Sequence, residues 1–113
     1  RLLSGDPAPT AVFVSNFMAC IGALHVAVAT GLRVPDDLSM ISFDEPDIAP
    51  FLTPSLTAVK LPYDDLGVVA VEVICDVLEG KEAQSRMIAL GPDAVVFRDS
   101  VATVRAARGG GNS

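Results

Sequence analysis

The chain has 113 residues, which is enough for one small domain with a modest core. Its net charge is −6, and it lacks the basic face that neutralises nucleic acid phosphates, so we expect no direct contact with DNA. Half of the residues are apolar, only 19% are charged and the mean hydropathy is +0.48. A free-standing domain of this size needs a more polar surface, so we expect further chain or a partner subunit to cover part of it.

The first half of the chain predicts a strand followed by a helix that has a cap at its start and a glycine at its end. Residues 1–8 form a lead-in that resembles the end of a helix, and we expect it to continue from upstream chain. The apolar run at residues 10–15 has the length of a strand buried on both faces. Asn16 stands where an N-cap belongs, and a helix over residues 17–30 ends at Gly31. Because this helix carries no charge, we expect it to pack on a sheet and also on a second subunit.

A second strand is predicted over residues 38–43, and it ends in the acidic pair Asp44 and Glu45. The strand–helix–strand order is a βαβ unit, in which the two strands are parallel neighbours. Parallel strands present their carboxyl ends at one edge of the sheet, so Asn16 and Asp44 should converge there. Open α/β sheets bind ligands at this edge.

The rest of the chain contains one more helix and several short segments. They are a Pro-punctuated connection at residues 46–54, strands at 56–60, 87–90 and 94–97, a helix at 63–79 and a disordered tail at 105–113. The helix at 63–79 has an acidic face and an apolar face, and the apolar face is expected to be buried. The residues of this apolar face are Leu66, Val69, Ala70, Val73 and Val77.

Two cysteines and one histidine limit the chemistry that the chain can support. Cys20 and Cys75 lie in apolar helical patterns, which predicts small buried thiols in a reducing compartment. With His25 alone and no Cys-x-x-Cys pair, we expect no metal site and no cofactor. The longest apolar run, residues 17–29, is too short to span a bilayer, and no signal peptide opens the chain, so no membrane contact is expected.

Five segments, in order and with similar gaps, resemble the LacI family of bacterial transcription regulators. They are residues 9–16, 21–24, 31–45, 56–67 and 95–100, and the resemblance covers roughly residues 9–104. It implies a periplasmic-binding-protein-like type I fold, an α/β fold with three layers and a parallel sheet, of which this chain is an incomplete fragment of a two-lobed domain. The implied division is residues 9–60 in the C-terminal subdomain, residues 61–100 as a crossover and part of the N-terminal subdomain, and residues 101–113 as a return segment and tail.

The resemblance also implies a function, the effector-sensing and dimerisation portion of a cytoplasmic DNA-binding regulator, with repressor as the expected type. The implied partners are a small sugar-like or purine-like effector, a second copy of the chain in a homodimer, and operator DNA. Operator DNA would be bound only through a helix-turn-helix headpiece upstream of this chain.

Particular residues match the effector-contact positions of that family. The acid in the position of Asp44 accepts hydrogen bonds from the effector, and Asn16 matches a second contact. Tyr63 matches an aromatic wall position that can stack on a sugar. Each has an alternative: Asp44 could cap the turn at residues 46–52, Asn16 could be a helix cap only, and Tyr63 could be packing between lobes.

The family's dimer interface corresponds to Ile21, Phe51 and Leu52, and the alternative is that they fill the internal core. Because the chain departs from the family pattern at several positions, its effector cannot be assigned from that of a known family member. Phe17 replaces an Asp, Glu45 replaces the second Asp after the strand, and Leu61 replaces a Gln.

Two other functional classes are considered. A periplasmic sugar-binding protein shares the fold and would share Asn16 and Asp44. The sequences of residues 31–39 and 56–62, however, resemble those of the regulators. An enzyme is not expected, because the chain has no Gly-x-Gly-x-x-Gly, P-loop or Gly-x-Ser-x-Gly motif.

Overall fold

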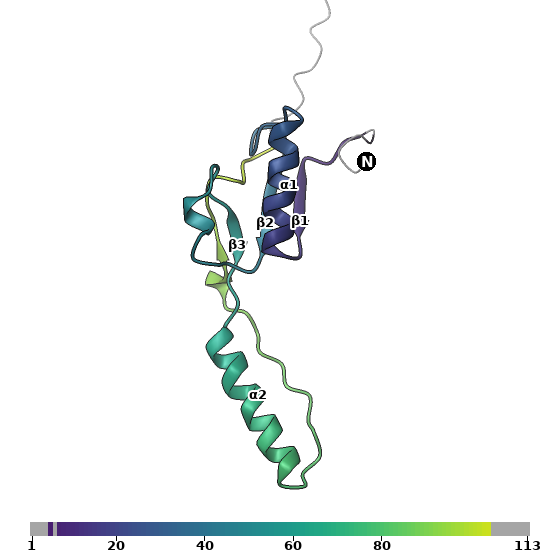
Figure 1. Cartoon of the computed structure of the whole chain (residues 1–113), viewed down its shortest axis with the longest axis vertical. Coiled ribbons are helices and arrows are strands. Elements are labelled where there is room, and N and C mark those ends of the chain that lie inside the picture. Colours follow the sequence, from purple (N-terminus) through teal and green to yellow (C-terminus); the bar gives the residue numbers. More distant parts are fainter. Residues whose placement is uncertain (1–4, 6, 105–113) are drawn as a thin grey trace, which may run out of the picture.

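A small sheet with one long helix packed on it forms the body of the protein, and a second helix extends away from this body (Figure 1). The computed structural model describes residue 5 and residues 7–104. In chain order, the elements are β1 (Ala11–Val14), α1 (Phe17–Ala29), β2 (Ser39–Phe43), η2 (Ala49–Phe51), β3 (Thr57–Val59), α2 (Tyr63–Leu78), η3 (Pro92–Ala94) and β4 (Val95–Val96).

The strand order in the sheet is β1-β2-β3-β4. β1 and β2 are parallel, as the βαβ pattern predicted, with Val14 opposite Ser42. β3 is also parallel to β2, with Phe43 opposite Val59. β4 pairs with β3 in the antiparallel direction, so the sheet is mixed at this edge. The direction reverses because the chain returns to the sheet after running the length of α2 and back (Figure 1).

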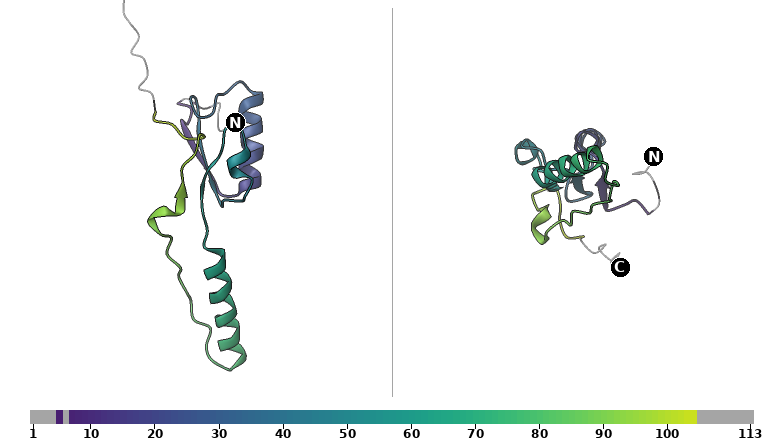
Figure 2. Two further views of the ribbon diagram at one scale, coloured as in Figure 1. Left: turned by 90° about the vertical axis from the view of Figure 1, so that its left-hand side faces the viewer. Right: turned by 90° about the horizontal axis from the view of Figure 1, so that it is seen from below.

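The core lies between α1 and the sheet. Phe17, Cys20, Leu24 and Ala27 recur at helical spacing along α1 and are buried, in a cluster with Leu38, Met40, Ala49 and Leu56. α1 and η2 lie on the same face of the sheet (Figure 2). The helix ends as predicted, because Gly31 adopts φ +83°, a left-handed conformation that favours glycine.

The first strand is not buried on both faces, so that prediction is wrong. Val12 and Val14 pack towards the core, but Phe13 is 57% exposed on the opposite face. Its ring contacts Phe43 edge to face, with 6.1 Å between ring centroids. No helix in the part of the chain described here covers this face, and the apolar run alone could not reveal that.

The apolar face of α2 is exposed, which also contradicts the prediction. α2 has no buried residue, and Leu66 and Val77 are 41% and 46% exposed. The Cα radius of gyration is 19.5 Å, against about 13 Å for a compact domain of roughly 100 residues. An amphipathic pattern states which face should be buried, but α2 finds no surface to pack against within the described residues (Figures 1 and 2).

Two smaller predictions are wrong for the same reason. Cys75 on α2 is exposed, whereas Cys20 is buried as expected. The strand expected over residues 87–90 is absent from the described structure, where this segment is extended chain and Met87 is 95% exposed. The division into lobes stays a prediction. The predicted disordered tail, 105–113, and most of the lead-in, 1–8, lie outside the described residues.

Candidate functional site

The carboxyl ends of β1 and β2 bring Asn16 and Asp44 to one edge of the sheet. Val14 lies opposite Ser42 in parallel register. Asn16 comes two residues after Val14 and Asp44 two residues after Ser42, so the two side chains start from the same level of the sheet. Below this edge the chain leaves β3 and enters α2, whose first residue is Tyr63 (Figure 1). The three residues predicted to contact an effector therefore come from three different connections at one end of the sheet.

Asp44 has an unusual backbone conformation. Its φ is +82°, in the left-handed region that side chains other than glycine rarely adopt. Two contacts hold this conformation: the Asp44 amide donates to the carbonyl of Val59 at 3.0 Å, and the Ser42 hydroxyl donates to the carbonyl of Asp44 at 3.1 Å. Such conformations persist where surrounding contacts enforce them, and they are frequent at ligand sites.

Asp44 and partial burial act on Tyr63 in the same direction. The Asp44 carboxylate, and to a smaller extent burial, raise the pKa of the Tyr63 phenol, because a nearby negative charge and loss of water both disfavour the phenolate. Tyr63 is 57% exposed, so much of its side chain is accessible to solvent. The arrangement places a hydrogen-bond acceptor beside an accessible aromatic surface.

Asn16 is a helix cap. Its side-chain oxygen accepts a hydrogen bond from the amide of Ala19 at 3.1 Å, at the first turn of α1. The capping role that sequence left open is therefore present. The cap uses only the acceptor oxygen, so the NH₂ group can still donate to a ligand.

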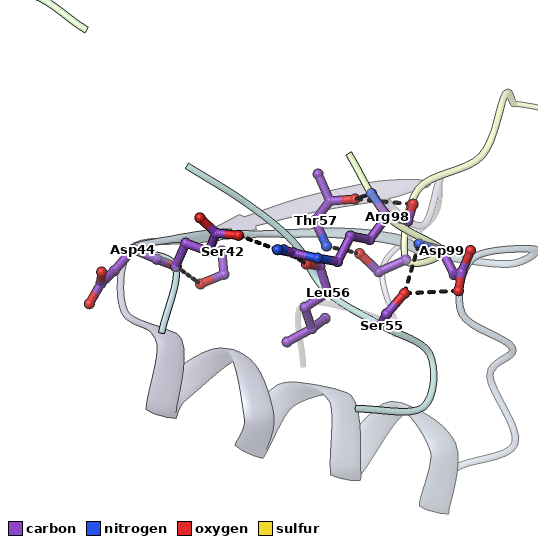
Figure 3. Close-up of polar contacts among 9 residues, drawn as sticks. Ser42, Asp44, Ser55, Leu56, Thr57, Arg98 and Asp99 are labelled. Carbon is purple, nitrogen blue, oxygen red and sulfur yellow. Dashed lines mark hydrogen bonds and ion pairs between the residues drawn. The ribbon is translucent and has the colours of Figure 1, made fainter. Parts of the chain in front are cut away.

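A residue that sequence reasoning did not assign to the site lies next to it. Arg98 forms an ion pair with Glu45, and both side chains are nearly buried, at 14% and 15% exposure. The Arg98 Nη1 also donates to the carbonyl of Leu56 at 2.7 Å (Figure 3). The only signal in the sequence was the position of Arg98 within the closing segment of the family resemblance, which carries no information about its partner.

The connection from β3 to the first turn of α2 borders an open hollow. This space of about 350 Å³ is lined by Lys60, Leu61, Pro62, Tyr63, Asp64 and Asp65. The amide of Lys60 donates to the carbonyl of Ala94 at 2.7 Å, which ties the outgoing connection to the returning one. Leu61, which replaces the Gln of the family pattern, lines this hollow.

The predicted interface residues differ in exposure. Phe51 is 82% exposed, whereas Ile21 and Leu52 are half-buried against the core. Both readings of these residues thus have structural support: Ile21 and Leu52 contribute to internal packing, and Phe51 projects outward. The outer face of α1 continues the apolar surface with Met18, Val26 and Val28, which are 71%, 53% and 57% exposed.

Among the described residues, no three His, Cys, Asp or Glu side chains gather as metal ligands would, and no helix is long and apolar enough to cross a membrane.

Residues 1–101 match the model of the periplasmic binding protein-like domain family. The chain belongs to this family. The predicted fold class, an incomplete α/β fragment of a two-lobed domain, is confirmed. Among characterised relatives, the HTH-type transcriptional repressor PurR of Salmonella arizonae is 40% identical over 102 residues, which are 90% of this chain and 30% of that protein.

Solved structures agree with this assignment. A LacI family transcriptional regulator from Mycobacterium smegmatis superposes with a TM-score of 0.78 at 35% identity, over 89% of this chain and 36% of that one. The lac repressor dimer bound to operator and the anti-inducer ONPF superposes with a TM-score of 0.71 at 26% identity, over 87% of this chain and 34% of the repressor. The resemblance to LacI-family regulators is therefore confirmed. The chain spans about a third of the length of these relatives.

Proposed function

We propose that this chain is the effector-sensing part of a LacI-type transcriptional regulator. The observation that carries the proposal is the position of Asn16 and Asp44 at the carboxyl edge of the parallel strands, from which the chain passes to Tyr63 and α2. This is the edge at which open α/β sheets bind ligands. The relatives with the same fold are regulators, which favours this reading over a periplasmic sugar-binding protein.

The side chains at this edge suit a small polar ligand with one flat face. A carboxylate such as Asp44 accepts hydrogen bonds from hydroxyl or ring N–H groups, with charge assistance. The exposed ring of Tyr63 offers a surface for a sugar's C–H face or for a purine ring, and Asn16 adds donors. The proposed effector is therefore sugar-like or purine-like, and no cofactor or catalytic step is required.

In the proposed mechanism, an effector bound between Asp44 and the other lobe favours a closed arrangement of the two lobes. A homodimer converts this change into a different spacing of two upstream headpieces, and so alters affinity for operator DNA. Ile21, Phe51 and Leu52 are the proposed dimer contacts, with residues 9–60 and 61–100 assigned to different lobes. The proposed location is the cytoplasm, where the operator is.

The test uses the full-length protein and begins with a thermal-shift screen of monosaccharides, sugar acids and purine bases. For any compound that stabilises the protein, Asp44→Asn is expected to weaken binding at least tenfold and to leave operator affinity without the compound unchanged. Asp47→Asn is the matched control, because Asp47 is an exposed carboxylate on the same connection. Equal affinity of Asp44→Asn and wild type for the compound would remove Asp44 from the site.

A further inference from the structure

The ion pair behind Asp44 connects the candidate effector contact to the strand that returns from α2. Glu45 follows Asp44 directly, and its carboxylate meets the guanidinium of Arg98, 53 residues later in the chain. Both side chains are shielded from solvent, at 14% and 15% exposure. Shielded pairs keep much more of their attraction than pairs at an open surface.

Arg98 is itself firmly attached to the sheet. Its amide donates to the hydroxyl of Thr57 at 2.8 Å, and that hydroxyl donates back to the carbonyl of Arg98 at 3.2 Å. The Nη1 group donates to the carbonyl of Leu56 at 2.7 Å, so the guanidinium is anchored at one end and holds Glu45 at the other (Figure 3). Arg98 thus connects β3 to the Asp44 segment, by which we mean residues 44 and 45, through the hydrogen bonds of its backbone and its guanidinium.

The Asp44 segment needs such support. With φ at +82°, Asp44 lies in a conformation that is uncommon for residues other than glycine and that persists where surrounding contacts enforce it. Ser42 and Val59 hold its backbone from the strand side. Glu45 is the first residue beyond it, and the bond to Arg98 fixes the chain on that other side. The Asp44 carboxylate points away from this network (Figure 3).

We propose that Arg98, acting through Glu45, is a positioning residue that holds the Asp44 carboxylate against Tyr63. Preorganised contacts of this kind depend on supporting residues that lock their orientation. The importance of the arrangement for effector binding rests on the proposed function. The position of Asp44 itself can be measured without any effector, so the two proposals can fail separately.

Tyr63 supplies the measurement, because it is the only tyrosine among these 113 residues and a Tyr63→Phe blank subtracts the absorbance of every other aromatic group. Its phenol is titrated by ultraviolet absorbance in wild type and in Arg98→Met, with Tyr63→Phe as the blank. Loss of the positive charge alone would disfavour the phenolate and raise the pKa of Tyr63 further. Loss of the Asp44 position would lower the pKa towards its ordinary value of 10.0. We expect the lower pKa.

Three variants calibrate the result. Asp44→Asn gives the value expected when the partner carboxylate is lost completely. Arg98→Lys keeps a positive charge but cannot hold Glu45 and Leu56 together in the same way, so an intermediate pKa is expected. Asp99→Asn changes a neighbouring carboxylate that bonds to Ser55 at 2.8 Å, and it should leave the pKa of Tyr63 unchanged. The charged groups beside Tyr63, namely Lys60, Asp64 and Asp65, are present in every variant.

An unchanged or raised pKa of Tyr63 in folded Arg98→Met would overturn the proposal. If Arg98→Met does not fold, Glu45→Gln decides, since it leaves the contacts of Arg98 with Leu56 and Thr57 in place. Glu45→Gln is then compared in the wild-type and Asp44→Asn backgrounds. A lowering of the Tyr63 pKa that requires Asp44 supports the positioning role. The same shift in both backgrounds is a direct effect of the Glu45 charge and contradicts it.

Discussion

Ser100 and Met40, 60 residues apart in the chain, are joined by two hydrogen bonds. The amide of Met40 donates to the carbonyl of Ser100 at 2.8 Å, and the hydroxyl of Ser100 donates to the carbonyl of Met40 at 2.7 Å. The same hydroxyl accepts from the amide of Thr57 at 2.8 Å, and Ser100 is fully buried. Ser100 therefore bridges β2 and β3 just before the point where these strands begin to pair, at Ile41 and Thr57.

Replacement of Ser100 by alanine should destabilise the fold. The variant leaves the Met40 carbonyl and the Thr57 amide without this partner in a buried setting, and each such group costs about 1–3 kcal/mol. We expect the free energy of unfolding in urea to fall by about 2 kcal/mol or more. Ser85→Ala, at an exposed position, is the control and should change it by less than about 0.5 kcal/mol. Equal stability of the two variants would contradict the bridging role.

The acid sensitivity of the fold should depend on Asp37. Arg33 lowers the pKa of Asp37 to about 2, because its guanidinium donates hydrogen bonds to the carboxylate at 2.7 and 2.9 Å. The pKa in the folded state is thus below the ordinary 3.8, so the ionised form contributes stability above about pH 4 that is lost as the pH falls to about 2.

In urea titrations, Asp37→Asn should therefore unfold at a lower denaturant concentration than wild type at pH 7. The difference should shrink below pH 4, be small at about pH 2 and vanish only below it. Asp93→Asn, another exposed carboxylate, serves as the control. A difference that persists unchanged at pH 2 would show that Asp37 acts through something other than its charge.

The two cysteines should react at very different rates. Burial raises the pKa of the Cys20 thiol and also blocks access to it, whereas Cys75 is exposed on α2. An aromatic disulfide reagent should modify one thiol rapidly in the native chain and two in denaturant. Cys75→Ser should abolish the rapid phase. Protection of Cys75 that disappears on dilution would indicate instead that a second copy covers α2.

Self-association should depend on Phe51. Because Phe51 is 82% exposed, Phe51→Glu should not disturb the core, and a weaker dimer would reflect the interface alone. We expect sedimentation to show the dissociation constant of the dimer raised by at least about tenfold, or about 1.4 kcal/mol. Met87→Glu is the control, since Met87 is equally apolar and 95% exposed, in the connection that follows α2. An unchanged dimer in Phe51→Glu would place the interface elsewhere.

Short stretches of the sequence are enough to predict the first helix and the first strands of this protein. The helix predicted over residues 17–30 is observed as Phe17–Ala29, and the strand predicted over 38–43 as Ser39–Phe43. Caps, glycine stops and apolar spacing act over four or five residues, so they can be read without a structure. The parallel βαβ rule extended this to the convergence of Asn16 and Asp44 at one edge.

The tertiary structure alone decided how distant segments meet and which apolar faces are covered. Neither the Arg98–Glu45 ion pair nor the Ser100 bridge leaves a periodic signal, because their partners are 53 and 60 residues apart. The apolar residues of α2 and Phe13 of β1 are exposed, although their sequence patterns are typical of buried surfaces. Burial depends on what lies opposite, and a pattern along one chain does not contain that information. The left-handed backbone of Asp44 likewise depends on contacts from Ser42, Val59 and, through Glu45, Arg98.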